Sequence, residues 1–190
     1  MGFLDALLGR RKVKGPAPDR LFAITTAAVA LDAGPGIRTR GSAAIVFQPL
    51  ATGDFQAIAQ EMEEVVRGTG EETGTTLDTA DDTYGYRWMV LHDDDIEDLA
   101  VGINAVSDAL QLGGYGERVL CAVFAFAQAD GTPLYFIYNY KRGTWYPFVP
   151  AGGQQQRSTE KELQVKAQVG AELPIEPELE RWFPLWGIPI

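Results

Sequence analysis

The sequence predicts an α+β fold in which a mainly antiparallel sheet is flanked by helices. Strand-like runs come largely in succession and are joined by short turns, at 84–92, 118–126, 134–140 and 144–149. This order favours antiparallel pairing over a doubly wound parallel sheet. Segments with apolar residues at helical spacing lie before, between and after these runs. The length of 190 residues suits one domain, which would bury about 70% of the surface of the unfolded chain.

The first helix of the body is expected to begin at Asp19, a favourable N-cap residue, and to end at Gly34–Pro35. Residues 42–48 then predict a strand, because apolar residues fill most of that run. Asp54 is expected to cap a second helix that ends near Gly68. The apolar face of that helix is formed by Phe55, Ile58, Met62 and Val65.

The polar, acidic segment 69–83 is expected to be a loop that enters the strand at 84–92. Asp93–Asp95 then place three carboxylates at the start of a third helix, where they suit the positive end of the helix dipole. Gly113–Gly114 end this helix. Its periodicity is carried by Ile96, Leu99, Ile103, Val106 and Leu110.

The strands at 118–126 and 134–140 are joined around Asp130–Gly131, a hairpin signal. A second turn at 141–143 leads into the strand at 144–149. The last helix is expected to run from Ser158 or Thr159 to about Glu172. Glu162 stands in capping-box position to Thr159. A tail that alternates proline with large apolar residues follows.

The charge is distributed unevenly along the chain. The whole chain carries a formal charge of −10 and residues 1–20 carry +3, so residues 21–190 carry −13. An acidic body repels nucleic acid and anionic lipid, and general nucleic-acid binding is therefore excluded. The composition also fits an intracellular protein. Cys121 is the single cysteine, so no internal disulfide forms, and no window approaches the roughly 20 apolar residues of a membrane span.

We expect residues 1–18 to be a basic amphipathic peptide with a linker, and residues 19–190 to be one α+β domain. As a helix, the peptide would present four apolar side chains and then four cations: Phe3, Leu4, Leu7, Leu8, Arg10, Arg11, Lys12 and Lys14. This pattern is typical of a short interfacial anchor. Burial of four apolar side chains supplies at most about 6–12 kcal/mol, and four basic residues near anionic lipid add about 1 kcal/mol each. Ordering eight residues costs about 8–16 kcal/mol, and the acidic body is repelled. Membrane binding is thus marginal. Docking on the chain's own domain or on a partner helix is the alternative.

No catalytic, cofactor or metal site is predicted. His92 has carboxylate neighbours but no nucleophile nearby in the sequence, and a solvated histidine at a strand end is the simpler interpretation. Cys121 lies in the most apolar strand and is expected in the core. The aspartate clusters at 78–82 and 93–95 lack the ligand spacing of a calcium loop.

The hairpin and its exit combine aromatic and basic residues, and Trp186 follows in the tail. These candidate contact residues are Tyr138, Tyr140, Lys141, Arg142, Trp145, Tyr146 and Trp186. Exposed Tyr and Trp mark interfaces. The favoured interpretation is that the rings pack beneath helices, because aromatic residues are also common strand formers.

Five stretches together resemble the PspA-associated protein PspAB family of actinobacteria and archaea. They are MGFLDALLGR at 1–10, DTYGYRW at 82–88, YKRGTWYPFVP at 140–150, KELQVKA at 161–167 and RWFPLWG at 181–187. The resemblance implies association with PspA, the membrane-stress protein of the phage-shock response, and offers no catalytic residues to assign. The order of elements is also similar to the YbjN and type III secretion chaperone-like fold.

The leading hypothesis is a non-enzymatic adaptor or regulator of a PspA envelope-stress system. It would be cytoplasmic, at or near the inner face of the membrane, with PspA as its partner, weak contact with anionic lipid and no cofactor. The first alternative is a chaperone-like module that binds a peptide or helix in an aromatic groove near Tyr138, Trp145, Tyr146 and Trp186. The second is an enzyme of unrecognised type with a polar pocket around His92, Lys141 or Arg142.

Overall fold

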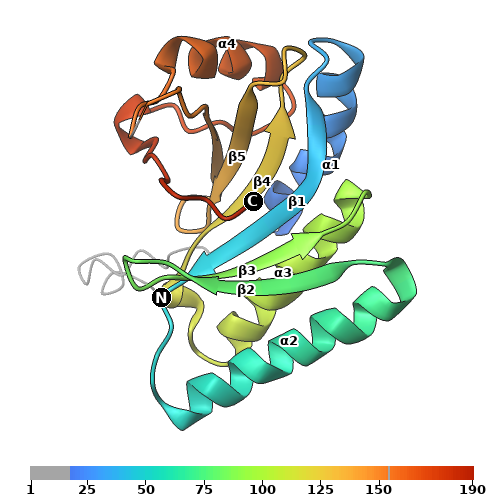
Figure 1. Ribbon diagram of the computed structural model, residues 1–190, viewed down its shortest axis with the longest axis vertical. Coiled ribbons are helices and arrows are strands. Elements are labelled where there is room, and N and C mark those ends of the chain that lie inside the picture. Colours follow the sequence, from blue (N-terminus) through green and yellow to red (C-terminus); the bar gives the residue numbers. More distant parts are fainter. Residues whose placement is uncertain (1–17, 154) are drawn as a thin grey trace, which may run out of the picture.

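The computed structural model describes residues 18–153 and 155–190. Within these residues it holds four α-helices and one six-stranded antiparallel sheet with the order β2-β3-β1-β4-β5-β6 (Figure 1). The elements are α1 (Pro18–Ala33), β1 (Arg38–Phe47), α2 (Gly53–Thr73), β2 (Thr76–Asp81), β3 (Arg87–His92), α3 (Ile96–Leu112), β4 (Val119–Ala127), β5 (Pro133–Asn139), β6 (Thr144–Phe148) and α4 (Thr159–Val169). The predicted α+β class with a mainly antiparallel sheet is confirmed.

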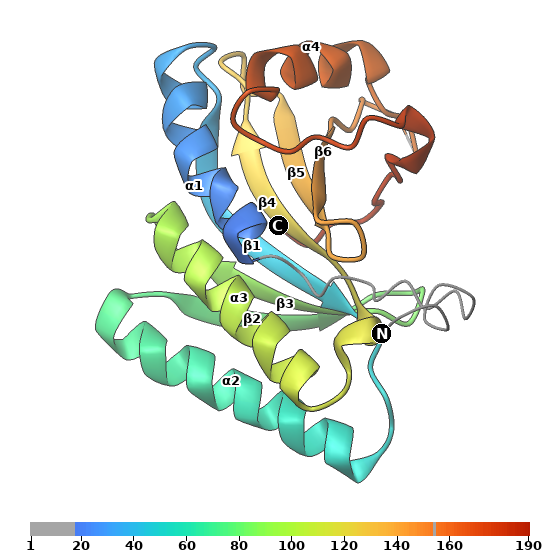
Figure 2. The same ribbon diagram turned by 180° about the vertical axis from the view of Figure 1, so that it is seen from behind.

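One face of the sheet packs against α1, α2 and α3, and α4 closes the end near β6 (Figure 2). Strand β1 lies at the centre, where Ile45 is paired with Met89 of β3 on one side and with Ala122 of β4 on the other. Because side chains alternate along a strand, Ile45 and Phe47 point into the helical layer, while Ala44 and Val46 point to the other face.

The second face of the sheet is covered by the C-terminal tail. The tail passes the β6 edge, where the backbone N–H of Trp145 donates to the carbonyl of Pro174 (3.0 Å). Trp182 then stacks on Tyr146, with ring centroids 6.3 Å apart. At the end of the chain the Tyr135 hydroxyl donates to the carbonyl of Ile190 (3.0 Å). The alternation of proline with large apolar residues therefore forms a cover for an apolar sheet face.

The segment predicted as a loop at 69–83 is largely regular structure, so that prediction is wrong. Helix α2 continues to Thr73 and ends at Gly74, which has the left-handed backbone (φ 93°) that favours glycine. Edge strand β2 follows and pairs with β3. Only Leu77 of β2 is buried, so the strand has almost no apolar pattern from which it could be recognised.

The predicted buried face of α2 also needs a correction. Val65 is 53% exposed, whereas the next residue, Val66, is 4% exposed and packs in the core. Thr52 is the N-cap, in place of the predicted Asp54, which lies in the first turn. Helix α3 agrees with its prediction, since Asp95 is the N-cap and its side chain accepts from the backbone N–H of Glu97 (2.8 Å).

The strands of the β4–β5 hairpin and β6 lie where they were predicted, within one or two residues. The predicted capping box between Thr159 and Glu162 is wrong. Ser158 is the N-cap of α4, and Glu162 points into the protein, where its side chain is fully buried against Arg157. Among the described residues, no helix has the length and apolar character needed to cross a membrane.

Candidate interaction site at the β5–β6 turn

The turn between β5 and β6 presents two basic side chains at its tip. The carbonyl of Asn139 accepts from the backbone N–H groups of Arg142 (3.2 Å) and Gly143 (2.8 Å). The side chain of Asn139 accepts from the backbone N–H of Lys141 (3.1 Å). Gly143 closes the turn with φ 65°, a conformation that residues with a side chain seldom adopt. Lys141 and Arg142 are thereby held outside the sheet, where both are exposed.

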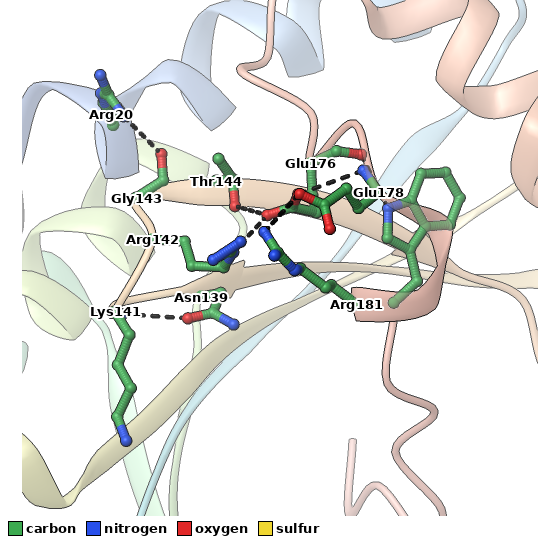
Figure 3. A network of polar contacts seen from close by, with 10 residues as sticks. Arg20, Asn139, Lys141, Arg142, Gly143, Thr144, Glu176, Glu178 and Arg181 are labelled. Atoms are coloured by element: carbon green, nitrogen blue, oxygen red, sulfur yellow. Dashed lines mark hydrogen bonds and ion pairs between the residues drawn. The ribbon is translucent and has the colours of Figure 1, made fainter.

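Glu176, from the tail, anchors this turn (Figure 3). Its Oε2 accepts from Arg142 Nε (2.8 Å) and from Thr144 Oγ1 (3.1 Å). Figure 3 shows Arg181 also pointing toward this carboxylate, and its Nη1 lies 3.9 Å from Oε1. The Glu176 side chain is 4% exposed, so a carboxylate buried beneath the turn orients arginines that lie at the surface.

The hydrogen bonds to Glu176 stabilise its charged form. Burial acts to raise the pKa of Glu176, but the hydrogen bonds from Arg142, from the backbone N–H of Glu178 and from Thr144 outweigh burial and lower that pKa. Glu176 is therefore ionised at neutral pH and keeps Arg142 in place.

The first turn of α1 is attached to the same place. Arg20 Nη1 donates to the carbonyl of Gly143 (3.3 Å), and the carbonyl of Arg20 accepts from Trp145 Nε1 (2.8 Å). The basic turn patch consists of Arg20, Lys141, Arg142 and Arg181, together with Glu176 and Glu178. Four cations and two carboxylates give it a formal charge of +2, on a body that carries −13.

The aromatic rings of the hairpin lie inside the protein. Tyr138 and Trp145 are completely buried, and Tyr140 and Tyr146 are 8% and 4% exposed. Burial raises the pKa values of both Tyr140 and Tyr146. Trp186 is partly buried and packs edge-on against Phe148, with ring centroids 5.3 Å apart. The hairpin therefore offers its basic tip as a surface and its rings as core.

A second buried carboxylate, Glu162, fixes the loop before α4. Its Oε1 accepts from the backbone N–H of Val149 (3.0 Å), and its Oε2 lies 2.8 Å from Arg157 Nη2. Arg157 also donates through Nη1 to the carbonyl of Trp182 and lies over the ring of Phe148. This pair therefore joins β6, α4 and the tail.

His92 lies at the end of β3 beside Ser42, its cross-strand neighbour. Ser42 Oγ lies 2.9 Å from His92 Nδ1, and Asp78 Oδ2 lies 3.4 Å from Nε2. In a serine-hydrolase triad the serine contacts Nε2 and the carboxylate contacts Nδ1. The two contacts of His92 are therefore the reverse of those in a triad. The side chains of His92 and Asp78 are 41% and 80% exposed. The arrangement is a solvated polar cluster without the order of groups that activates a serine.

The remaining residues considered from the sequence have structural roles. Cys121 is buried, and burial raises the pKa of its thiol to about 12, so the thiolate is scarce at neutral pH. Asp82 shapes the turn before β3, since its Oδ1 accepts from the backbone N–H of Tyr84 (2.8 Å) and its Oδ2 from Trp88 Nε1 (3.0 Å). Within the part of the chain that the structure describes, no group of three or more His, Cys, Asp or Glu residues is arranged to hold a metal ion.

The peptide predicted to contact a membrane or a partner, with Phe3, Leu4, Leu7, Leu8, Arg10, Arg11, Lys12 and Lys14, lies outside the described residues. Sequence reasoning found Lys141 and Arg142 but missed Arg20, Glu176 and Arg181. The available signal was weak. It was the position of one acidic residue, Glu176, between Pro174 and Pro177 in a tail rich in proline and large apolar residues.

Comparison with known proteins identifies a family. The model of a protein family described as PspA associated protein B, PspAB, matches residues 1–190. No curated protein and no solved structure matches the chain.

Proposed function

The chain belongs to the PspA associated protein B family, and from this membership we propose that it is a non-enzymatic adaptor or regulator that binds PspA in the envelope-stress response. The name of the family indicates an association with PspA and an accessory role. The proposal places the protein at the cytoplasmic face of the membrane, where the basic residues of segment 1–18 meet anionic lipid.

The observation that carries the proposal is the basic turn patch. Glu176 holds Arg142 at 2.8 Å and lies 3.9 Å from Arg181, while Lys141 is exposed beside them. Arginine side chains fixed in advance lose less conformational entropy when they bind a carboxylate-rich surface. Positive charge on a strongly acidic body also orients the protein toward an acidic partner. The patch therefore suits an acidic surface of PspA.

The two alternatives receive less support. A peptide-binding aromatic groove would need exposed rings, yet Tyr138, Trp145 and Tyr146 are buried. An enzyme would need a polar pocket around its titratable groups. The pockets beside α2 are lined by other residues and contain none of His92, Lys141 or Arg142.

Size-exclusion chromatography of the full chain with its cognate PspA tests the proposal. We expect the two proteins to elute together, and we expect anionic liposomes to strengthen the association through segment 1–18. Separate elution both with and without anionic liposomes would overturn direct binding.

A further inference from the structure

The outer surface of the helical layer holds an apolar groove between α2 and α3. Two adjoining hollows form it, with cavity volumes of about 250 Å³ and 60 Å³, and both are lined by Val65, Val66 and Ala105. Three side chains along it are exposed although they are apolar: Val65 (53%), Val101 (48%) and Leu112 (89%). We name this surface the α2–α3 groove and define it by Ile58, Val65, Val101, Ala105, Ala109 and Leu112.

The groove has the size of a short helix and not of a cofactor. Along α3 it extends from Asp98 to Gly113, which at 1.5 Å per residue is about 22 Å. Its larger hollow, at about 250 Å³, is below the roughly 300–1,000 Å³ of small-molecule pockets. A row of apolar side chains from an amphipathic helix fits such a groove.

The two helices that form the groove also carry most of the negative charge. Together α2 and α3 contain nine acidic residues and one basic residue, a formal charge of −8. Residues 21–190 as a whole carry −13. Glu61 and Asp98 lie at the groove itself. The occupant is therefore expected to combine apolar side chains with positive charge.

The chain contains one segment of this chemistry outside the described residues. Residues 2–9, GFLDALLG, place Phe3, Leu4, Leu7 and Leu8 at helical spacing, and four cations follow between Arg10 and Lys14. Eight helical residues span about 12 Å, which is shorter than the groove. The cations would follow directly, beside the acidic residues of α2 and α3.

The segment is attached close enough to reach the groove. The described chain begins at Pro18, and Arg20 lies at the β5–β6 turn. Tyr140, from the same turn, packs in the same core cluster as the buried residues of α3. Figure 2 shows α3 between α1 and α2, so the groove lies across one helix from the start of α1. Crossing one helix takes about 10 Å, whereas the eight residues 10–17 extend up to about 26 Å.

We propose that the α2–α3 groove binds residues 2–9 of the same chain as an amphipathic helix. The docked segment covers Val65, Val101 and Leu112, and its cations face the acidic helices. In this state the apolar side of the segment is withdrawn from lipid, so docking competes with the membrane contact proposed above. The docking itself does not depend on the proposed association with PspA.

Paramagnetic relaxation in the full chain tests this proposal. A nitroxide label is attached at Gly9→Cys, and Cys121 stays unlabelled because it is buried and its thiol has a raised pKa. We expect the methyl signals of Val65, Val101 and Leu112 to lose most of their intensity. The signals of Val29 on α1 and Leu163 on α4, which are also exposed, are expected to keep theirs.

Two matched variants distinguish docking of the segment in the groove from transient approach of the nitroxide label to it. Val65→Asp is expected to restore the signals of Val101 and Leu112, whereas Val29→Asp, at another exposed valine of a helix, is expected to leave the losses unchanged. Unchanged groove signals in the labelled wild type, or equal losses in the Val65→Asp variant, would overturn the proposal. In a further experiment, chains that carry the nitroxide are mixed with isotope-enriched chains that do not. If the signal losses arise only between different chains in this mixture, the segment binds a second copy, which would also overturn the proposal. Binding of PspA is measured separately, so either proposal can fail alone.

Discussion

Two glutamates, Glu162 and Glu176, are buried within the described part of the chain, and each contacts an arginine. A buried carboxylate without a partner would cost several kcal/mol, so the arginines are required for the fold. Glu176 contacts Arg142 of the β5–β6 turn, 34 residues earlier in the chain. Glu162 contacts Val149, just after β6, and Arg157, which precedes it by 5 residues. The sequence shows that these residues are acidic but not that they are buried, because their burial depends on how β6, α4 and the tail pack against one another.

Replacing Glu162 by alanine is expected to destabilise the protein by about 3 kcal/mol, because Arg157 and the N–H of Val149 lose their acceptor in the interior. For a chain of this length the melting temperature should fall by about 6–12 °C. Calorimetry measures the melting temperature, and Glu160→Ala, at an exposed position of the same helix, is the control. A loss equal to that of the control would mean that the pair contributes nothing.

Glu176→Gln is expected to remove a pH-dependent part of the stability. The folded pKa of Glu176 is below its ordinary value of 4.5, so its contribution is fully present above pH 4.5 and is lost as the pH falls through the lower folded value. At pH 7 the variant should lose about 1.5 kcal/mol, the value of hydrogen bonds to a charged group. Denaturant unfolding at pH 7 and near pH 3 measures the difference, which should shrink in acid. A difference independent of pH would contradict this assignment.

Helix α2 shows what periodicity alone can and cannot specify. Val65 and Val66 both lie at helical spacing from Met62, because residues three and four positions further along a helix lie on the same face. The full helix decides between them. Among the positions of α2 whose burial is described, the buried ones are Phe55, Ala59, Met62, Val66 and Gly70. This series is complete only when the helix extends beyond Gly68. Edge strand β2 was missed for a similar reason, since Leu77 is its only buried residue.

The neighbouring valines of α2 provide an internal comparison. Val66→Ala is expected to cost about 2 kcal/mol, because it leaves a cavity in the core, whereas Val65→Ala should stay within about 0.5 kcal/mol of the wild type. Urea unfolding of the two variants measures both. Equal losses would place the two side chains in similar environments and contradict the register of α2.

At the scale of the whole molecule, the fold class could be predicted and the sheet order could not. Turn signals and alternation identified the run from β4 to β6, because those strands pair with their neighbours in sequence. The position of β1 between β3 and β4 depends on contacts across about 45 and 80 residues, which no local pattern specifies. The same holds for the tail and for the basic turn patch, which gathers residues from α1, the β5–β6 turn and the tail.

Charge is the other property of the whole molecule, since a patch of +2 stands on a body of −13. Association through such a patch depends on salt, because ions screen exposed charges over about 8–10 Å at physiological ionic strength. The affinity for an acidic partner is therefore expected to fall between low and moderate salt. Titrations at several salt concentrations measure this, and an affinity that does not change would exclude an electrostatic patch.

The most direct test of the account is the affinity of the full chain for its cognate PspA, measured by titration calorimetry for the wild type, Lys141→Glu and Arg67→Glu. Lys141 belongs to the basic turn patch, whereas Arg67 is exposed on α2, away from it, and its replacement makes the same change in charge. We predict that Lys141→Glu weakens binding by about tenfold, or 1.4 kcal/mol, and that Arg67→Glu binds as the wild type does. Equal affinities for all three proteins, or no binding by the wild type, would contradict the account.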